Sequence, residues 1–149
     1  MTLYYHTEDD LVEVRPDILS YGASDLEPQM LEGESIINRT IESRWYRAAA
    51  AENGLNFHTT VFNPALLLNA DDQLKRLAVY KSLQLSYLYL MKEAPEPDAF
   101  ERQMSTFRKL YEEELQLVLG AGLDYDWDES GAIEAGENLQ PTYRRLQRC

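Results

Sequence analysis

The sequence DDQLKRLAVYKSLQLSYLYLMKE, residues 71–93, is the stretch that decides the fold. Apolar residues recur in it at helical spacing, and Asp71 and Asp72 place negative charge where the positive end of a helix dipole lies. The sequence therefore predicts a helix over residues 72–93. The apolar residues of this helix form two stripes. The first stripe consists of Leu74, Leu77, Ala78, Leu85 and Leu88, and the second consists of Tyr80, Leu83, Tyr87, Leu90 and Met91.

The two stripes leave only a narrow polar edge on this helix. That edge is made of Lys75, Arg76, Lys81 and Gln84. A helix that is apolar on most of its circumference either lies at the centre of a fold or presents one face to another subunit. A single chain of this size has few elements with which to cover both stripes, and a large uncovered apolar patch marks an interaction site. We therefore expect the second stripe to be a subunit interface.

Helical patterns also lie on both sides of this stretch. The first covers residues 25–52 and ends before Gly54, which suits the left-handed cap of a helix C-terminus. Its apolar stripe is formed by Ile37, Ile41, Trp45 and Ala48. The other begins at Pro97-Asp98 and ends at the GAG of residues 120–122. Its stripe is formed by Phe100, Met104, Phe107, Tyr111, Leu115 and Val118.

These patterns predict a mainly α fold in one domain, residues 1–149. We expect a bundle of three long helices in a helical core over residues 25–123. An extended arm with at most two helical turns precedes it, over residues 1–24. The connection 55–70 is rich in leucine and phenylalanine and should pack on the bundle. An acidic β-hairpin or turn follows at 124–137, and a short basic tail at 138–149.

Length and charge exclude several classes of protein. A chain of 149 residues with a formal charge of −12 repels nucleic acid phosphates, so a groove-reading DNA binder is not expected. No apolar run approaches the roughly 18 residues of a membrane helix, so we expect no membrane contact. The first residues lack the pattern of a signal peptide, which indicates the cytoplasm of the producing cell. The single cysteine, Cys149, cannot form an internal disulfide.

The sequence shows no recognisable catalytic motif. The two histidines, His6 and His58, lie in different segments, and we expect each to be a surface or partly packed residue rather than a metal ligand. The chain has no glycine-rich phosphate loop, nucleophile elbow or HExxH sequence. The glutamates at 112–114 are typical of a solvated helix face. We therefore expect no enzyme activity and no cofactor other than a possible calcium ion.

The acidic segment 124–137 raises the question of calcium. From Asp126 onward its order fits the twelve-residue loop of an EF-hand, with a glycine at the sixth position, Gly131. The side chains at the ligand positions are those of Asp126, Asp128, Ser130, Glu134 and Glu137. The alternative is a β-hairpin with DESG at its tip and strands at 123–127 and 132–136, since Asp, Ser and Gly are also ordinary turn residues.

The tail is the second candidate for a binding segment. Residues 138–149 contain three arginines and no acidic residue, and they follow a strongly acidic segment. Such a short peptide does not fold alone, but it can become ordered in a groove of a partner, with its arginines on carboxylates. The alternative is a frayed terminus. The residues expected to dock are Tyr143, Arg144, Arg145, Leu146 and Arg148.

The order of these segments resembles the head–tail connector, or adaptor, proteins of tailed bacteriophages. Three stretches carry the resemblance: IESRWYRAAAAENG at 41–54, VFNPALLLNADDQLKRLAVYKSLQLSYLYL at 61–90, and EPDAFERQMSTFRKLYEEELQLVLGAGLDYDWDESG at 96–131. It covers roughly residues 30–137 and is a pattern of helices and spacing rather than a catalytic signature. The acidic turn differs from the family's pattern in having Ser130 before the glycine.

The resemblance implies a structural protein of the virion neck. Such connectors assemble as a homo-oligomeric ring, twelve-fold in that family, beneath the portal protein. The ring extends the DNA channel and offers a platform to the next neck or tail protein, while double-stranded DNA passes through its lumen without specific binding. By analogy, the arginine tail is expected to insert into a portal cleft. An acidic lumen suits this role because it repels DNA.

Two other functions remain open at this point. The EF-hand-like loop favours a calcium-dependent binding module, and the net charge alone is consistent with an acidic mimic of DNA that blocks a nucleic-acid-binding protein. These readings differ in what they require of the chain. The calcium-dependent module needs metal, the DNA mimic needs a basic partner protein, and the connector needs copies of itself on a portal.

Overall fold

The computed structural model describes residues 5–22, 25–56 and 59–131, and the expected mainly helical fold is confirmed. In chain order the elements are α1 (Glu8–Val14), the 3₁₀-helix η1 (Ile18–Tyr21), α2 (Glu27–Ile41), the π-helix η2 (Glu42–Tyr46), α3 (Arg47–Glu52), the 3₁₀-helix η3 (Pro64–Leu66), α4 (Ala70–Gln73), α5 (Lys75–Glu93) and α6 (Asp98–Ala121). No helix within these ranges is long and apolar enough to cross a membrane.

A π-helical turn changes the register of the first long helix. α2, η2 and α3 follow one another without a break, so the helix predicted over 25–52 is present. Trp45 is buried as expected, but Ala48 is exposed and Ala49 takes its place in the core. A π turn spans one more residue than an α turn and therefore rotates the residues that follow. The prediction for Ala48 is wrong because the sequence pattern assumed a constant period of 3.6.

The helix predicted over 72–93 is divided near its start. At Leu74 the backbone has φ −116° and ψ −9°, which separates the single turn of α4 from α5. The Leu74 side chain is fully buried, so the break lies against the core. As a result Asp71 and Asp72 belong to α4, and Lys75 begins α5.

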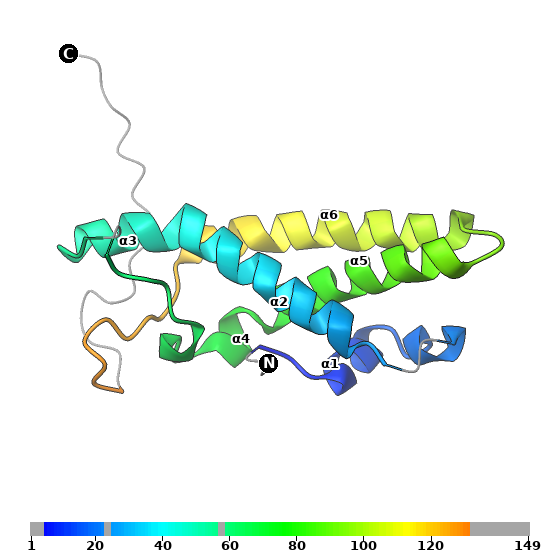
Figure 1. The fold of residues 1–149 in the computed structure, drawn as a ribbon, viewed down its shortest axis with the longest axis horizontal. Helices are drawn as coiled ribbons and strands as arrows, with labels where there is room; N and C mark the ends of the chain where they lie inside the picture. The colour runs from blue at the N-terminus through cyan, green and yellow to red at the C-terminus, as the bar shows by residue number, and fades with distance from the viewer. Residues whose placement is uncertain (1–4, 23–24, 57–58, 132–149) are drawn as a thin grey trace, which may run out of the picture.

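α5 lies at the centre of the molecule. It runs beside α6, is crossed by α2, and has α1 on the side away from α6 (Figure 1). Its two stripes contribute to two clusters of buried residues. In the first, Leu74, Leu77 and Ala78 pack with side chains of α2, η2 and α6. In the second, Val79, Leu83, Tyr87 and Leu90 pack with Leu11, Ile18, Leu26, Met30 and Phe107.

This arrangement corrects the predicted subunit interface. Leu83 and Tyr87 are fully buried within one chain, and Leu90 is 5% exposed. Tyr80 and Met91 are partly buried. The cover comes from α2 and α6 and also from the segment that the sequence suggested was an extended arm, because α1 and η1 place Leu11 and Ile18 on this stripe. The prediction that the stripe needs a second copy is therefore wrong for its buried members, since the chain covers it with its own α2, α6 and N-terminal segment.

Polar and aromatic contacts fix this cover in place. Tyr87 stacks on Phe107, with ring centroids 5.8 Å apart and planes 6° from parallel. Its hydroxyl accepts a hydrogen bond of 3.0 Å from Nε of Arg15, which directly follows α1. Burial is the largest effect on the Tyr87 hydroxyl and raises its pKa, against the opposing effect of Arg15.

The connection 55–70 packs on the far end of the bundle, as expected. Phe62 and Leu67 are buried, and an antiparallel bridge joins Leu67 to Tyr125 in the segment after α6. The rings that meet here are those of Trp45, Tyr46, Phe62, Tyr125 and Trp127. Where the first strand of the predicted hairpin was expected, at 123–127, the structure has only this isolated bridge, with backbone hydrogen bonds from Leu68 to Asp124 and from Asp126 to Leu66. The second strand, 132–136, lies outside the described residues.

Candidate functional site

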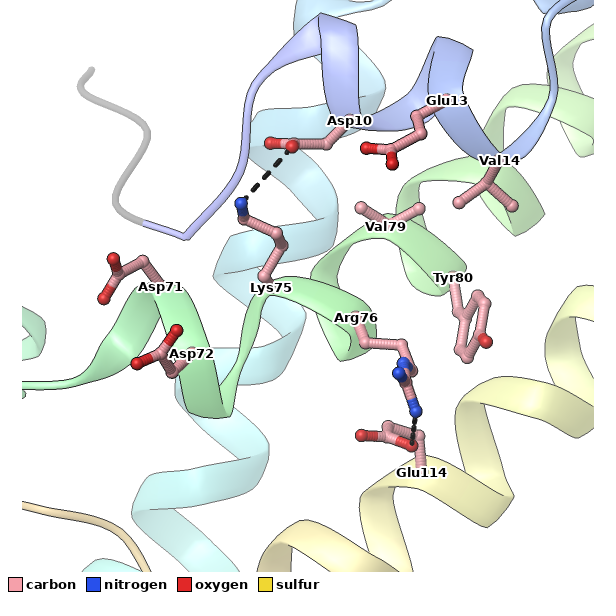
Figure 2. Close-up of a pocket in the computed structure, with 10 residues that line it drawn as sticks. All are labelled: Asp10, Glu13, Val14, Asp71, Asp72, Lys75, Arg76, Val79, Tyr80 and Glu114. Atoms are coloured by element: carbon pink, nitrogen blue, oxygen red, sulfur yellow. Dashed lines mark ion pairs between the residues drawn. The ribbon is translucent and has the colours of Figure 1, made fainter.

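A groove of about 530 Å³ opens between α1, α4, α5 and α6 (Figure 2). We call it the acidic groove. Its walls combine charged and apolar side chains from elements far apart in sequence. The lining residues are Asp10, Glu13 and Val14 of α1, Asp71 and Asp72 of α4, Lys75, Arg76, Val79 and Tyr80 of α5, and Glu114 of α6.

Both cations of the acidic groove are paired. Lys75 Nζ lies 3.5 Å from Oδ1 of Asp10, and Arg76 Nη1 lies 4.0 Å from Oε2 of Glu114 (Figure 2). Burial is the largest effect on the Asp10 carboxyl and raises its pKa. Hydrogen bonds from the backbone and hydroxyl of Thr7 and the charge of Lys75 oppose it, so the pKa of Asp10 lies below the ordinary value of 3.8. Asp10 therefore stays ionised at neutral pH.

Three carboxylates of the acidic groove are not paired with a cation in the described part of the chain. Within the described residues, those of Glu13, Asp71 and Asp72 make no ion pair and no side-chain hydrogen bond. Five acids against two bases give this groove a formal charge of −3. Val14, an apolar residue 44% exposed to solvent, lies beside them. The groove thus presents unpaired negative charge next to an apolar surface, which suits a ligand that is basic and partly apolar.

A second polar cluster is buried in the interior. His6 Nδ1 lies 2.8 Å from Oε1 of Glu34, and His6 Nε2 lies 2.7 Å from Oγ of Ser82. Each nitrogen of the ring therefore has one polar partner, the Glu34 carboxylate on one side and the Ser82 hydroxyl on the other. The backbone N–H of Tyr5 donates to the same Glu34 oxygen at 3.0 Å. His6 was expected to be a surface or partly packed residue, but it is buried.

The residue types of this cluster are those of a hydrolase triad, in which histidine removes a proton from serine and a carboxylate orients the ring. That chemistry requires a serine oxygen that a substrate can reach. Ser82 is fully buried, and Gly33 lies so close that a Cβ atom there would be 3.0 Å from the Ser82 hydroxyl. In this arrangement the cluster therefore joins the N-terminal segment to α2 and α5, and we call it the His6 clamp.

The acidic turn after α6 is closed by its own carboxylates. Asp126 is 3% exposed, and its two carboxylate oxygens accept the N–H groups of Ser130, at 3.0 Å, and of Gly131, at 2.8 Å. Asp128 also accepts from the Ser130 N–H. Hydrogen bonds from Ser130, first of all from its hydroxyl, lower the pKa of Asp128. The positive φ values at Glu129, 57°, and Gly131, 81°, are those of a tight turn.

Part of the predicted sites lies outside the described residues. This holds for Glu134 and Glu137 of the calcium loop, and for the docking residues Tyr143, Arg144, Arg145, Leu146 and Arg148. Of the calcium loop, the structure describes Asp126, Asp128 and Ser130, which meet at the turn. In the part of the chain that is described, no group of three His, Cys, Asp or Glu residues is arranged to hold a metal ion.

The acidic groove and the His6 clamp were both missed by the sequence analysis. Asp71 and Asp72 appeared there as residues that favour a helix start, and the acids of α1 appeared as part of an arm. Only the docking of α1 against α5 makes them two walls of one groove. His6 and Ser82 are 76 positions apart in the chain, so no spacing motif connects them. Comparisons with known protein families, with characterised proteins and with solved structures found no match.

Proposed function

We propose that the protein is a structural subunit of a tailed-phage virion, an adaptor in the neck between the portal and the tail. In this proposal copies of the chain form a ring that extends the DNA channel. The three long helices form the frame of each subunit, the acidic turn lies at the end of the frame, and the basic tail docks on a partner. The ring assembles on the portal and receives the next neck or tail protein.

The observation that carries the proposal is the order of segments described above for 41–54, 61–90 and 96–131. These segments contain η2 and α3, then η3, α4 and most of α5, then α6 and the acidic turn. The aromatic rings of Trp45 and Tyr46, from the first segment, pack on Tyr125 and Trp127, from the last. The first and last segments that carry the resemblance are therefore in contact in the fold, which supports the proposal that they belong to one shared architecture.

The surface chemistry supports a structural role. The net charge of −12 suits a channel wall from which DNA slides without sticking. Because the second stripe of α5 is buried, we propose that copies contact one another through the outer face of α6 instead. That face carries both signs of charge, with an exposed leucine, Leu117, that is 67% accessible. Its charged residues are Glu101, Arg102, Arg108, Lys109, Glu112 and Glu113.

Electron microscopy of the purified chain mixed with the portal protein of the same phage genome tests the proposal. We expect rings attached to the portal. Leu117→Glu is expected to prevent ring formation without unfolding the chain, whereas Tyr89→Glu, at a residue 45% exposed on α5, is the matched control and should not. Deleting residues 141–149 should leave the fold intact and abolish attachment. Portal particles that remain bare with the native chain would refute the proposed function.

A further inference from the structure

We propose that the acidic groove binds the basic tail of the same chain, residues 143–148, when no partner holds it. This goes beyond the adaptor function, which needs the tail only on the portal. The occupant is the segment YRRLQR, which carries three arginines, a tyrosine and a leucine. Its composition complements the groove in both respects, since arginines pair with carboxylates and the aromatic and aliphatic side chains suit an apolar wall.

The charges of the acidic groove match those of the segment in number. The groove has three unpaired carboxylates, those of Glu13, Asp71 and Asp72, and the segment has three arginines and no acid. Lys75 and Arg76 do not oppose an incoming cation strongly, because Asp10 and Glu114 already neutralise them. The exposed Val14 and the partly buried Tyr80 offer the apolar contact for Tyr143 and Leu146.

The segment that follows α6 is fastened beside the acidic groove at Asp124. After α6, the backbone N–H of Asp124 donates to the side chain of Gln73 at 3.0 Å, and the side chain of Asn69 donates to the Asp124 carboxylate at 2.5 Å. Asn69 and Gln73 flank Asp71 and Asp72 on α4. At Asp124 the chain therefore passes next to one wall of the groove, seven residues before Gly131, the last residue that the structure describes.

The length of the chain permits docking on the same molecule. Residues 132–142, which join the last described residue to the basic segment, span up to about 40 Å when extended. A short tether of this kind gives the tail an effective concentration in the millimolar range at its own groove. Weak ion pairs at an open groove therefore suffice for docking within one chain, while docking between dilute copies requires much higher affinity.

Cys149 is the chain's single cysteine, so a nitroxide spin label can be placed there in the full-length protein without other changes. We expect the label to broaden the amide NMR signals of α1 and α4 around the acidic groove selectively. Signals near Glu101, about 20 Å along α6 from Glu114, should stay sharp. Broadening should disappear in 1 M salt, where the Debye length is only about 3 Å.

Charge variants identify the contact. The unpaired charge of the groove is removed by combining Glu13→Gln, Asp71→Asn and Asp72→Asn. This triple variant should weaken docking of the tail roughly tenfold, and the loss is measured as weaker broadening of the amide signals around the groove. Glu93→Gln with Glu96→Gln, exposed carboxylates at and just after the C-terminal end of α5 and outside the groove, is the control and should leave the broadening unchanged. Replacing the three tail arginines with glutamine should have the same effect as the groove variant.

A mixed sample separates the possible occupants. Isotope-labelled chains with Cys149→Ser are combined with unlabelled, spin-labelled chains, so that broadening arises only between molecules. We expect none. Broadening in the mixed sample would mean that the tail of a second copy occupies the groove, and uniform or no broadening in the first experiment would mean that the tail does not dock there. Either result overturns the inference, while ring formation on the portal, seen by microscopy, tests the adaptor function separately.

Discussion

Replacing His6 with alanine is expected to destabilise the whole chain and to detach its N-terminal segment. His6 is 5% exposed and contacts Glu34 and Ser82 through its two ring nitrogens. These contacts tie residues 5–14 to α2 and α5, and α1 in turn covers the second apolar stripe of α5. The substitution therefore weakens a polar clamp on which the burial of Leu83 and Tyr87 depends.

The magnitude follows from the two contacts that are lost. A buried hydrogen bond to a charged carboxylate contributes about 1.5–3 kcal/mol, and leaving a buried hydroxyl without its partner costs about 1–3 kcal/mol. Together these give a loss of about 2.5–6 kcal/mol in the free energy of unfolding, a large part of the roughly 5–15 kcal/mol typical of a domain. Ser82→Ala removes only one of the contacts and should cost about 1–3 kcal/mol.

Urea unfolding at pH 7.5 measures both variants, and their double mutant gives the coupling between His6 and Ser82, expected to be about 1 kcal/mol. Asp9→Ala, at an exposed residue of α1, is the matched control and should change the free energy by less than about 1 kcal/mol. Hydrogen exchange should become faster in α1 than in α6. Because the stripe on α5 becomes accessible, His6→Ala should also self-associate more than the native chain.

A loss below about 1 kcal/mol for His6→Ala would refute the reasoning, because it would mean that the clamp contributes nothing beyond an ordinary surface contact. If His6→Ala loses the full expected stability but hydrogen exchange is equally fast in α1 and α6, the expectation that the N-terminal segment detaches would be refuted. In that case the N-terminal segment would not open separately from the bundle.

Three further perturbations have expected outcomes. Leu83→Glu places a charge in the core and should lower the free energy of unfolding in urea by about 3–5 kcal/mol, while Tyr89→Glu should lower it by less than about 1 kcal/mol. If the two variants were equally stable, the second stripe of α5 would again be a candidate for the subunit interface. The lowered pKa of Asp10 means that its ionised form stabilises the fold above the ordinary pKa of 3.8, and that this stability is lost as the pH falls through the lower folded-state pKa. Asp10→Asn should therefore flatten the fall of the urea midpoint below about pH 4, and an unchanged slope would contradict this. Asp126→Ala should lower stability by about 1–2 kcal/mol without any calcium present, since two backbone N–H groups lose their acceptor, and a chelator should leave the Tm of the native chain unchanged; a Tm that falls with chelator would favour the calcium loop.

The positions of the long helices followed from local properties of the sequence. Periodic apolar residues, the acids before residue 75 and the glycines at 54, 120 and 122 act over a few residues, so they predicted α5, α6 and the helix from 27 to 52 without knowledge of the fold. The exception at Ala48 has a local cause as well. A π turn at Glu42–Tyr46 shifts the register by one residue, and no residue type in the stretch signals such a turn by itself.

Which surface covers each helix was decided only by the tertiary structure. The sequence showed correctly that α5 is apolar on two sides, but not that residues 5–22 supply the missing cover. Short segments such as α1 and η1 carry few apolar residues, so their pattern does not distinguish an arm in solvent from a segment packed on the core. The free energy that places them comes from contacts with distant residues, such as the bond of His6 with Ser82.

The same reason applies to the candidate site. The sequence by itself determined the net charge of −12, the acidic turn and the basic tail, because these are properties of composition and order. The acidic groove exists because α1, α4, α5 and α6 meet, and the pairing of Lys75 with Asp10 decides which of its charges remain free. Helix formation depends on neighbours along the chain, whereas a groove depends on how helices pack against one another, and that is a property of the whole fold.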